Sequence, residues 1–186
     1  FSVGCGLLVS ALGGALVSQL FGRRAGAITA LLLAVSPIEV WYAQEARMYA
    51  LLCALTLTSS ICLVRLMRRL GGRRAWVCST LANIAAIYTH YYGGLVLLAQ
   101  AGWALLHVVA RRDWRFTRAW VLAQVGLGLA LAPWLPVVWM YWRAANATYW
   151  PGQLSLQYIV SQTGLGFAGA GLTVSDQAAL PLILGT

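Results

Sequence analysis

The chain has 186 residues, of which 61% are hydrophobic and only 9% are charged. Its mean hydropathy of +0.75 excludes an ordinary soluble domain and indicates a polytopic membrane protein. The formal charge is +9, and every basic residue is Arg. Because these Arg residues cluster between apolar runs, we interpret them as signals of membrane topology and not as a nucleic-acid surface.

A membrane-spanning helix needs roughly 20 apolar residues, and six runs of about this length follow one another along the chain. We therefore expect an all-α fold, a polytopic bundle of six complete spans plus a truncated seventh, forming a single transmembrane domain over residues 1–186. Both ends of the sequence lie inside apolar runs, which suggests a fragment of a longer protein. The predicted spans are 1–20, 26–43, 49–67, 75–90, 92–110 and 119–142, with the seventh starting near Ala178.

The Arg residues predict the orientation of these spans. Eleven of the 13 lie in or beside alternate connections, and only Arg47 and Arg143 fall on the other side. The positive-inside rule makes the Arg-rich connections cytoplasmic in a protein integral to the cell membrane. Residues 44–49, the turn at 88–93 and a long loop at 143–177 then face outward together, so they are candidates for one outer site.

Prolines mark the predicted breaks in these helices. Ser36-Pro37-Ile38-Glu39 has the form of a capping box with proline at the first helical position, and Glu39 is interpreted as the helix cap. Either a new short helix starts at Pro37 and lies along the outer membrane surface, or Pro37 only kinks the second span. Pro133 and Pro136 should bend the outer half of the sixth span.

The most informative stretch is residues 36–49, which ends in Gln44-Glu45-Ala46-Arg47-Met48-Tyr49, a polar cluster at a predicted membrane edge. A guanidinium suits bidentate capture of a phosphate, so Arg47 is a candidate phosphate ligand; the alternative is an interfacial Arg that reaches toward lipid headgroups. Glu45 is a candidate general base, metal ligand or orienting partner of Arg47, or simply half of a structural pair.

A second candidate is His90 in Tyr88-Thr89-His90-Tyr91-Tyr92, at the outer end of the fourth span. It suits a metal ligand or a donor to phosphate, with an ordinary interfacial residue as the alternative. His107 is expected to be structural. Five aromatic residues near the sixth span are interpreted as a membrane-interface belt or as a groove for a lipid chain or sugar: Trp139, Tyr141, Trp142, Tyr149 and Trp150.

The segment from Ser36 to Leu51, with its Gln-Glu-Ala-Arg-Met-Tyr motif, resembles the second outer loop of bacterial protein O-mannosyltransferase-like enzymes, which are GT-C glycosyltransferases. Three further stretches are similar to other parts of that family: Phe21-Gly22-Arg23-Arg24-Ala25-Gly26, Tyr88-Thr89-His90-Tyr91-Tyr92-Gly93, and Pro133-Trp134-Leu135-Pro136 with Tyr149-Trp150-Pro151.

The resemblance implies an enzyme that transfers a sugar from a polyprenyl-phosphate-linked donor to a protein, lipid or glycan acceptor on the outer or periplasmic face. It implies donor-phosphate binding by Gln44, Arg47, Tyr49 and His90, and a catalytic role for Glu45. The principal catalytic Asp is expected upstream of residue 1, so the fragment by itself is expected to be inactive. No cofactor is assigned with certainty, and a divalent metal with Glu45 and His90 as its ligands is a candidate.

Two other functions compete with this one. The first is a membrane transporter or flippase, and the second is a non-catalytic subunit that binds a glycolipid. Transporters tend to carry broken helices and ionisable residues near mid-membrane, whereas the polar residues noted here lie at the ends of the spans. That distribution argues against transport.

Overall fold

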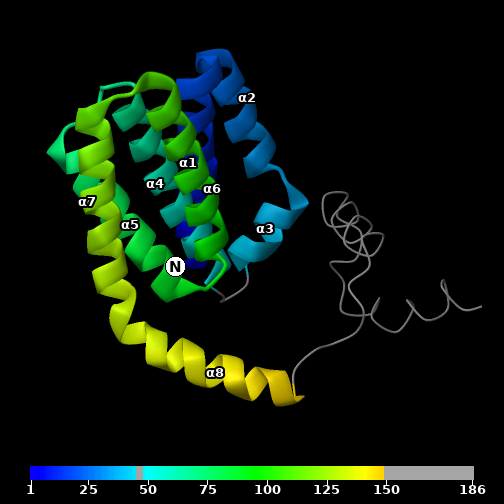
Figure 1. Ribbon diagram of the computed structural model, residues 1–186. Coiled ribbons are helices and arrows are strands. Elements are labelled where there is room, and N and C mark those ends of the chain that lie inside the picture. The colour runs from blue at the N-terminus through cyan, green and yellow to red at the C-terminus, as the bar shows by residue number, and fades with distance from the viewer. Residues whose placement is uncertain (45–47, 149–186) are drawn as a thin grey trace, which may run out of the picture.

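The structure is a computed structural model that describes residues 1–44 and 48–148, and this part of the chain is helical without a strand. The predicted all-α class is thus confirmed. The helices pack side by side, with α8 leaving the bundle at its lower end (Figure 1). In chain order they are α1 (Ser2–Phe21), α2 (Arg23–Ala34), α3 (Pro37–Gln44), α4 (Tyr49–Met67), α5 (Arg73–Thr89), α6 (Gly93–Arg111), α7 (Trp114–Leu131), the 3₁₀ turn η1 (Ala132–Trp134) and α8 (Leu135–Thr148).

Within residues 1–44 and 48–148, four helical segments are long and apolar enough to cross a membrane: α1, α4, α6 and the stretch Trp114–Tyr141. The prediction of a membrane protein therefore holds in its coarse form. The second predicted span, 26–43, is instead two helices, and α5 has only 17 residues. The count of six spans stays a prediction, and the expected seventh, near Ala178, lies outside the described residues.

Proline positions account for the breaks. A separate helix α3 begins at Pro37, with Glu39 in its first turn, so a new helix starts there as the first alternative predicts; its position along the membrane surface stays a prediction. The Ser36 carbonyl accepts the first bond of α3 from the Val40 N–H, at 3.0 Å. Pro133 lies in η1, and α8 turns sharply away from α7 after it (Figure 1), as predicted. Helix α8 extends to Thr148, so the first residues of the predicted loop 143–177 are helical.

Small residues bring α1 and α2 into close contact. A single residue, Gly22, separates the two helices, and its φ of 96° is one that side chains rarely allow. A Cβ atom at Gly14 would lie 2.7 Å from the Ala30 Cβ and 2.9 Å from the Gly26 carbonyl oxygen. One at Gly26 would collide with Ser18. The pair is a close helix crossing of the small-residue kind common in membranes.

The long helices α1, α4, α5, α6 and α7 cross the bundle in alternate directions, and α2 and α3 together make one return between α1 and α4 (Figure 1). The α1–α2, α4–α5 and α6–α7 connections, which carry most of the Arg residues, lie at one end, hereafter the Arg-rich end (Figure 1). The end of α3, the start of α4 and the α5–α6 turn lie at the opposite end. The predicted grouping of residues around 44, 49 and 90 on one side of the bundle is therefore correct.

Candidate functional site

The α5–α6 turn and the start of α4 together form a cluster of aromatic rings around His90. The His90 ring stacks on Tyr91, with centroids 4.3 Å apart, and lies 4.7 Å from the Tyr92 ring. Tyr49, which is the last residue of the Gln44-Glu45-Ala46-Arg47-Met48-Tyr49 motif, lies 5.6 Å from the His90 ring. Two predicted site residues that are far apart in the sequence are thus in contact, and we call this group the His90 cluster.

A backbone hydrogen bond orients the imidazole of His90. Its Nδ1 atom accepts from the Tyr92 N–H at 3.2 Å. An accepting Nδ1 places the proton of the neutral ring on Nε2, which can then donate to an anion. Local geometry explains the position: α5 ends at Thr89, His90 has the extended φ of −162°, and α6 starts at Gly93.

The remaining predicted ligands directly precede Tyr49 along the chain. Gln44 is the last residue of α3. Glu45 and Arg47 lie outside the described residues, so their predicted roles stay predictions. The described chain resumes at Met48, and Tyr49 belongs to the His90 cluster.

Glu39 is the described acid nearest to this segment in sequence. It lies in the first turn of α3, and partial burial raises the pKa of its carboxyl group above the ordinary value. Within residues 1–44 and 48–148, no three His, Cys, Asp or Glu side chains gather in a way that could hold a metal ion. The proposed pairing of Glu45 with His90 at a metal falls partly outside the described residues.

An apolar groove starts at the His90 cluster and continues down the side of the bundle. It has a volume of about 640 Å³, and Tyr91 and Tyr92 form its mouth. Its walls are mainly Leu95, Leu98 and Ala101 of α6, and the two leucines are 64% and 71% exposed. From Tyr92 to Ala101 a helix rises about 13 Å, at 1.5 Å per residue. The hydrogen-bond donors of the His90 cluster therefore lie next to this apolar groove.

Sequence reasoning missed a buried polar cluster half-way along the helices. The Gln100 Nε2 atom donates to the hydroxyls of Ser59 at 2.7 Å and Ser60 at 2.9 Å, while its Oε1 accepts from Asn83 Nδ2 at 3.2 Å. Ser79 donates to the Ser59 carbonyl oxygen at 3.4 Å. The statement that polar residues lie only at span ends is therefore wrong, because α4, α5 and α6 each contribute polar groups near their middles.

This cluster adjoins a cavity of about 30 Å³ between α5, α6 and α7, lined by Asn83 and Gln124 among others. The Asn83 Oδ1 atom is buried and accepts no hydrogen bond from the described part of the protein. The volume suits about one water molecule, which is far smaller than a transported solute. Neutral amides and hydroxyls of this kind commonly join helices in membranes. The polar cluster consequently fits a structural role, and transport gains no support from it.

Comparison of the chain with models of known protein families, with curated proteins and with solved structures finds no match.

Proposed function

We propose that this chain belongs to an integral membrane glycosyltransferase that moves a sugar from a polyprenyl-phosphate-linked donor to an acceptor at the end of the bundle opposite the Arg-rich end. The observation that carries the proposal is the junction of the His90 cluster with the apolar groove. A lipid-linked sugar has the same two parts, a phosphate that needs donors and a hydrocarbon chain that needs an apolar surface. The resemblance of residues 36–51 to the mannosyltransferase-like family gives independent support.

In this proposal each group of the site has a defined task. The isoprenoid chain lies along Leu95 and Leu98, and the phosphate reaches the His90 cluster at the mouth of the groove. Nε2 of His90 donates to a phosphate oxygen, and the charge that develops on the phosphate as the sugar leaves strengthens that bond. Arg47 supplies the compensating positive charge, and a carboxylate acts as base on the acceptor hydroxyl.

A hydrogen bond to a developing charge predicts the effect of removing the imidazole. His90→Phe keeps an aromatic ring beside Tyr91 but removes the Nε2–H donor. Sugar transfer by the full-length protein, measured with a radiolabelled polyprenyl-phosphate sugar, should lose roughly tenfold or more in kcat/KM, because a charged hydrogen bond contributes about 1.5–3 kcal/mol. Arg47→Ala should abolish transfer, and unchanged turnover in both variants would refute the phosphate site.

The neighbouring residue offers a matched control. The Thr89 hydroxyl donates to the Ala85 carbonyl oxygen of its own helix at 2.7 Å. Thr89→Val should therefore retain transfer. Equal losses in Thr89→Val and His90→Phe would point to a damaged α5–α6 turn and not to a lost phosphate ligand.

The groove has its own test. Ala101→Trp places an indole in the groove, so the KM for a long-chain donor should rise more than that for a short-chain donor. Ala99→Trp is the matched control, because Ala99 is exposed on the same helix and does not line the groove. If the full-length protein binds polyprenyl phosphate, loses that binding in Ala101→Trp, and transfers no sugar, the protein is a non-catalytic glycolipid-binding subunit and not an enzyme.

A further inference from the structure

A second groove lies at the Arg-rich end, away from the His90 cluster. Its volume is about 620 Å³, and it is bounded by α1, α4, α6 and the start of α7. We propose that this groove binds the headgroup of an anionic phospholipid, with the lipid chains descending along its apolar wall. This inference is independent of the proposed sugar transfer, because the two sites share no residue.

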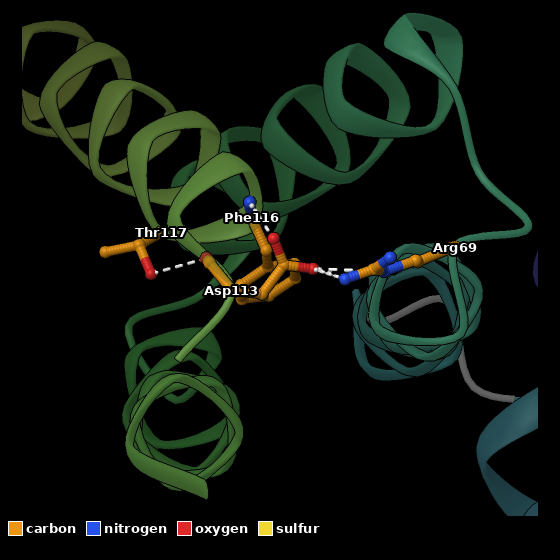
Figure 2. Close-up of polar contacts among 4 residues, drawn as sticks. All are labelled: Arg69, Asp113, Phe116 and Thr117. Atoms are coloured by element: carbon orange, nitrogen blue, oxygen red, sulfur yellow. Dashed lines mark hydrogen bonds and ion pairs between the residues drawn. The ribbon is translucent and has the colours of Figure 1, made fainter. Parts of the chain in front are cut away.

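The groove carries more positive than negative charge. Arg68, Arg69 and Arg111 line it, and Asp113 is the one acid among the described residues that do so. Asp113 is already engaged: its Oδ2 accepts from Nε and Nη2 of Arg69 at 3.1 and 2.9 Å, and its Oδ1 accepts from the Phe116 N–H at 3.3 Å (Figure 2). One guanidinium is thereby compensated, and two remain for an external anion.

Arg68 and Arg111 are the two groups available to that anion. Arg68 donates from Nη1 to the Gln19 carbonyl oxygen of α1, a neutral acceptor that leaves its charge uncompensated. Arg111 lies exposed in the last turn of α6. Guanidinium groups bind phosphate oxygens through two parallel hydrogen bonds, which makes an arginine pair suited to a phosphodiester.

The helix ends and connections that carry these arginines are held in place by contacts within the protein. Asp113 caps α7, and its bond to Arg69 ties the α4–α5 connection to the α6–α7 connection. Beneath them is the buried cluster of Leu63, Leu66, Ala104 and Phe116. Because the ion pair and this core join all the helices that carry the arginines, little ordering remains for the ligand to impose.

The apolar wall selects a lipid over a free phosphate ion. Leu20 and Met67 line the groove beside Arg68, and Val64 and Trp103 line it farther along α4 and α6. Trp103 is two turns of α6 before Arg111, about 12 Å along the axis, and is 41% exposed. A headgroup at Arg111 would bring its acyl chains onto these side chains. Zwitterionic lipids carry their own ammonium, so an uncompensated pair of arginines favours an anionic lipid.

The test counts the lipids that stay bound to the full-length protein. Protein equilibrated with equal amounts of phosphatidylglycerol and phosphatidylcholine is analysed by native mass spectrometry. We expect a retained phosphatidylglycerol and, in Arg111→Gln, roughly fivefold weaker retention, the effect of about 1 kcal/mol per basic residue near an anionic surface. Arg118→Gln removes the same charge from an exposed position on α7 that does not line the groove, and should retain the lipid.

Four results would overturn the proposal. Equal loss in Arg118→Gln and Arg111→Gln would mean diffuse attraction to the whole Arg-rich end. Equal occupancy by phosphatidylglycerol and phosphatidylcholine would remove the charge argument. Displacement of the lipid by millimolar inorganic phosphate, or equal retention of dihexanoyl phosphatidylglycerol, would assign the groove to a soluble anion. The melting temperature in phosphatidylcholine alone, expected to be the same for both variants and the parent, verifies that Arg111→Gln folds.

Discussion

Replacement of Gln100 by Leu tests whether the buried polar cluster holds the bundle together. Gln100 is 8% exposed, and its amide makes three hydrogen bonds to residues of α4 and α5. Leu has a similar volume, so the change removes the polar contacts without leaving a large cavity. All three bonds join separate helices, and the substitution therefore acts on the tertiary contacts and not on α6 itself.

The expected magnitude follows from these contacts. Interhelical hydrogen bonds in a bilayer contribute about 0.6 kcal/mol each on average, so three of them sum to about 2 kcal/mol. One of these three bonds is donated by Asn83, and leaving its Nδ2 donor without an acceptor adds a desolvation penalty of about 1 kcal/mol. We expect Gln100→Leu to lower the free energy of unfolding by about 2 to 3 kcal/mol.

The assay is reversible unfolding of the purified protein by SDS titration from mixed micelles, followed by circular dichroism. Gln124→Leu is the matched control, because Gln124 lines the same small cavity and its amide makes no hydrogen bond within the described part of the chain. A double-mutant cycle with Ser59→Ala should give a coupling of about 0.6 kcal/mol. A Gln100→Leu variant as stable as the parent, or no more affected than Gln124→Leu, would refute the reasoning.

Three further predictions concern the connections and the α1–α2 crossing, and the same unfolding titration measures each of them. Gly26→Leu should destabilise the protein by about 1–3 kcal/mol by forcing α1 and α2 apart, whereas Gly126→Leu, where a side chain meets open space, should change stability by less than about 0.5 kcal/mol. Arg112 has a φ of 47° at the end of α6, so Arg112→Gly should stabilise the protein by about 0.5–1 kcal/mol; a loss would show that its side chain has a contact that outweighs the strain. The Phe116 N–H and the Arg69 guanidinium lower the pKa of Asp113 below its ordinary value of 3.8. The ionised carboxylate therefore stabilises the fold fully above pH 3.8, and this stabilisation is lost as the pH falls through the lower pKa of the folded state. Asp113→Asn should flatten the acid dependence of the unfolding free energy, and an unchanged pH profile would contradict this prediction.

Local chemistry in the sequence determined most of the helices and the chemical difference between the ends of the bundle. Long apolar runs predict α1, α4 and α6 within a few residues, since a helix satisfies its own backbone groups whatever surrounds it. Pro37 and Pro133 break helices because proline has no N–H to donate. The alternation of Arg-rich connections likewise required only the order of the runs along the chain.

The sequence only partly predicted the site. It indicated that Tyr49 and His90 share one end of the bundle, because two predicted spans separate them and the chain returns to the same side after two crossings. The contact between their rings and the groove below Tyr92 depends on how α4, α5 and α6 pack, which hydropathy does not encode. For the predicted span 26–43, the sequence allowed either a new helix or a kink at Pro37 and did not decide between them.

Tertiary structure alone decided which isolated polar and small residues are partners. Ser59 and Gln100 are 41 residues apart, and each by itself looks like a tolerated polar residue in an apolar run. Gly14 and Gly26 become an interface only when α2 folds back along α1. Asp113 accepts from Arg69, 44 residues earlier, because the α4–α5 and α6–α7 connections meet at one end of the bundle. Helix formation is local and can be predicted from the chain, whereas these pairings arise from the rotation and depth of each helix against its neighbours.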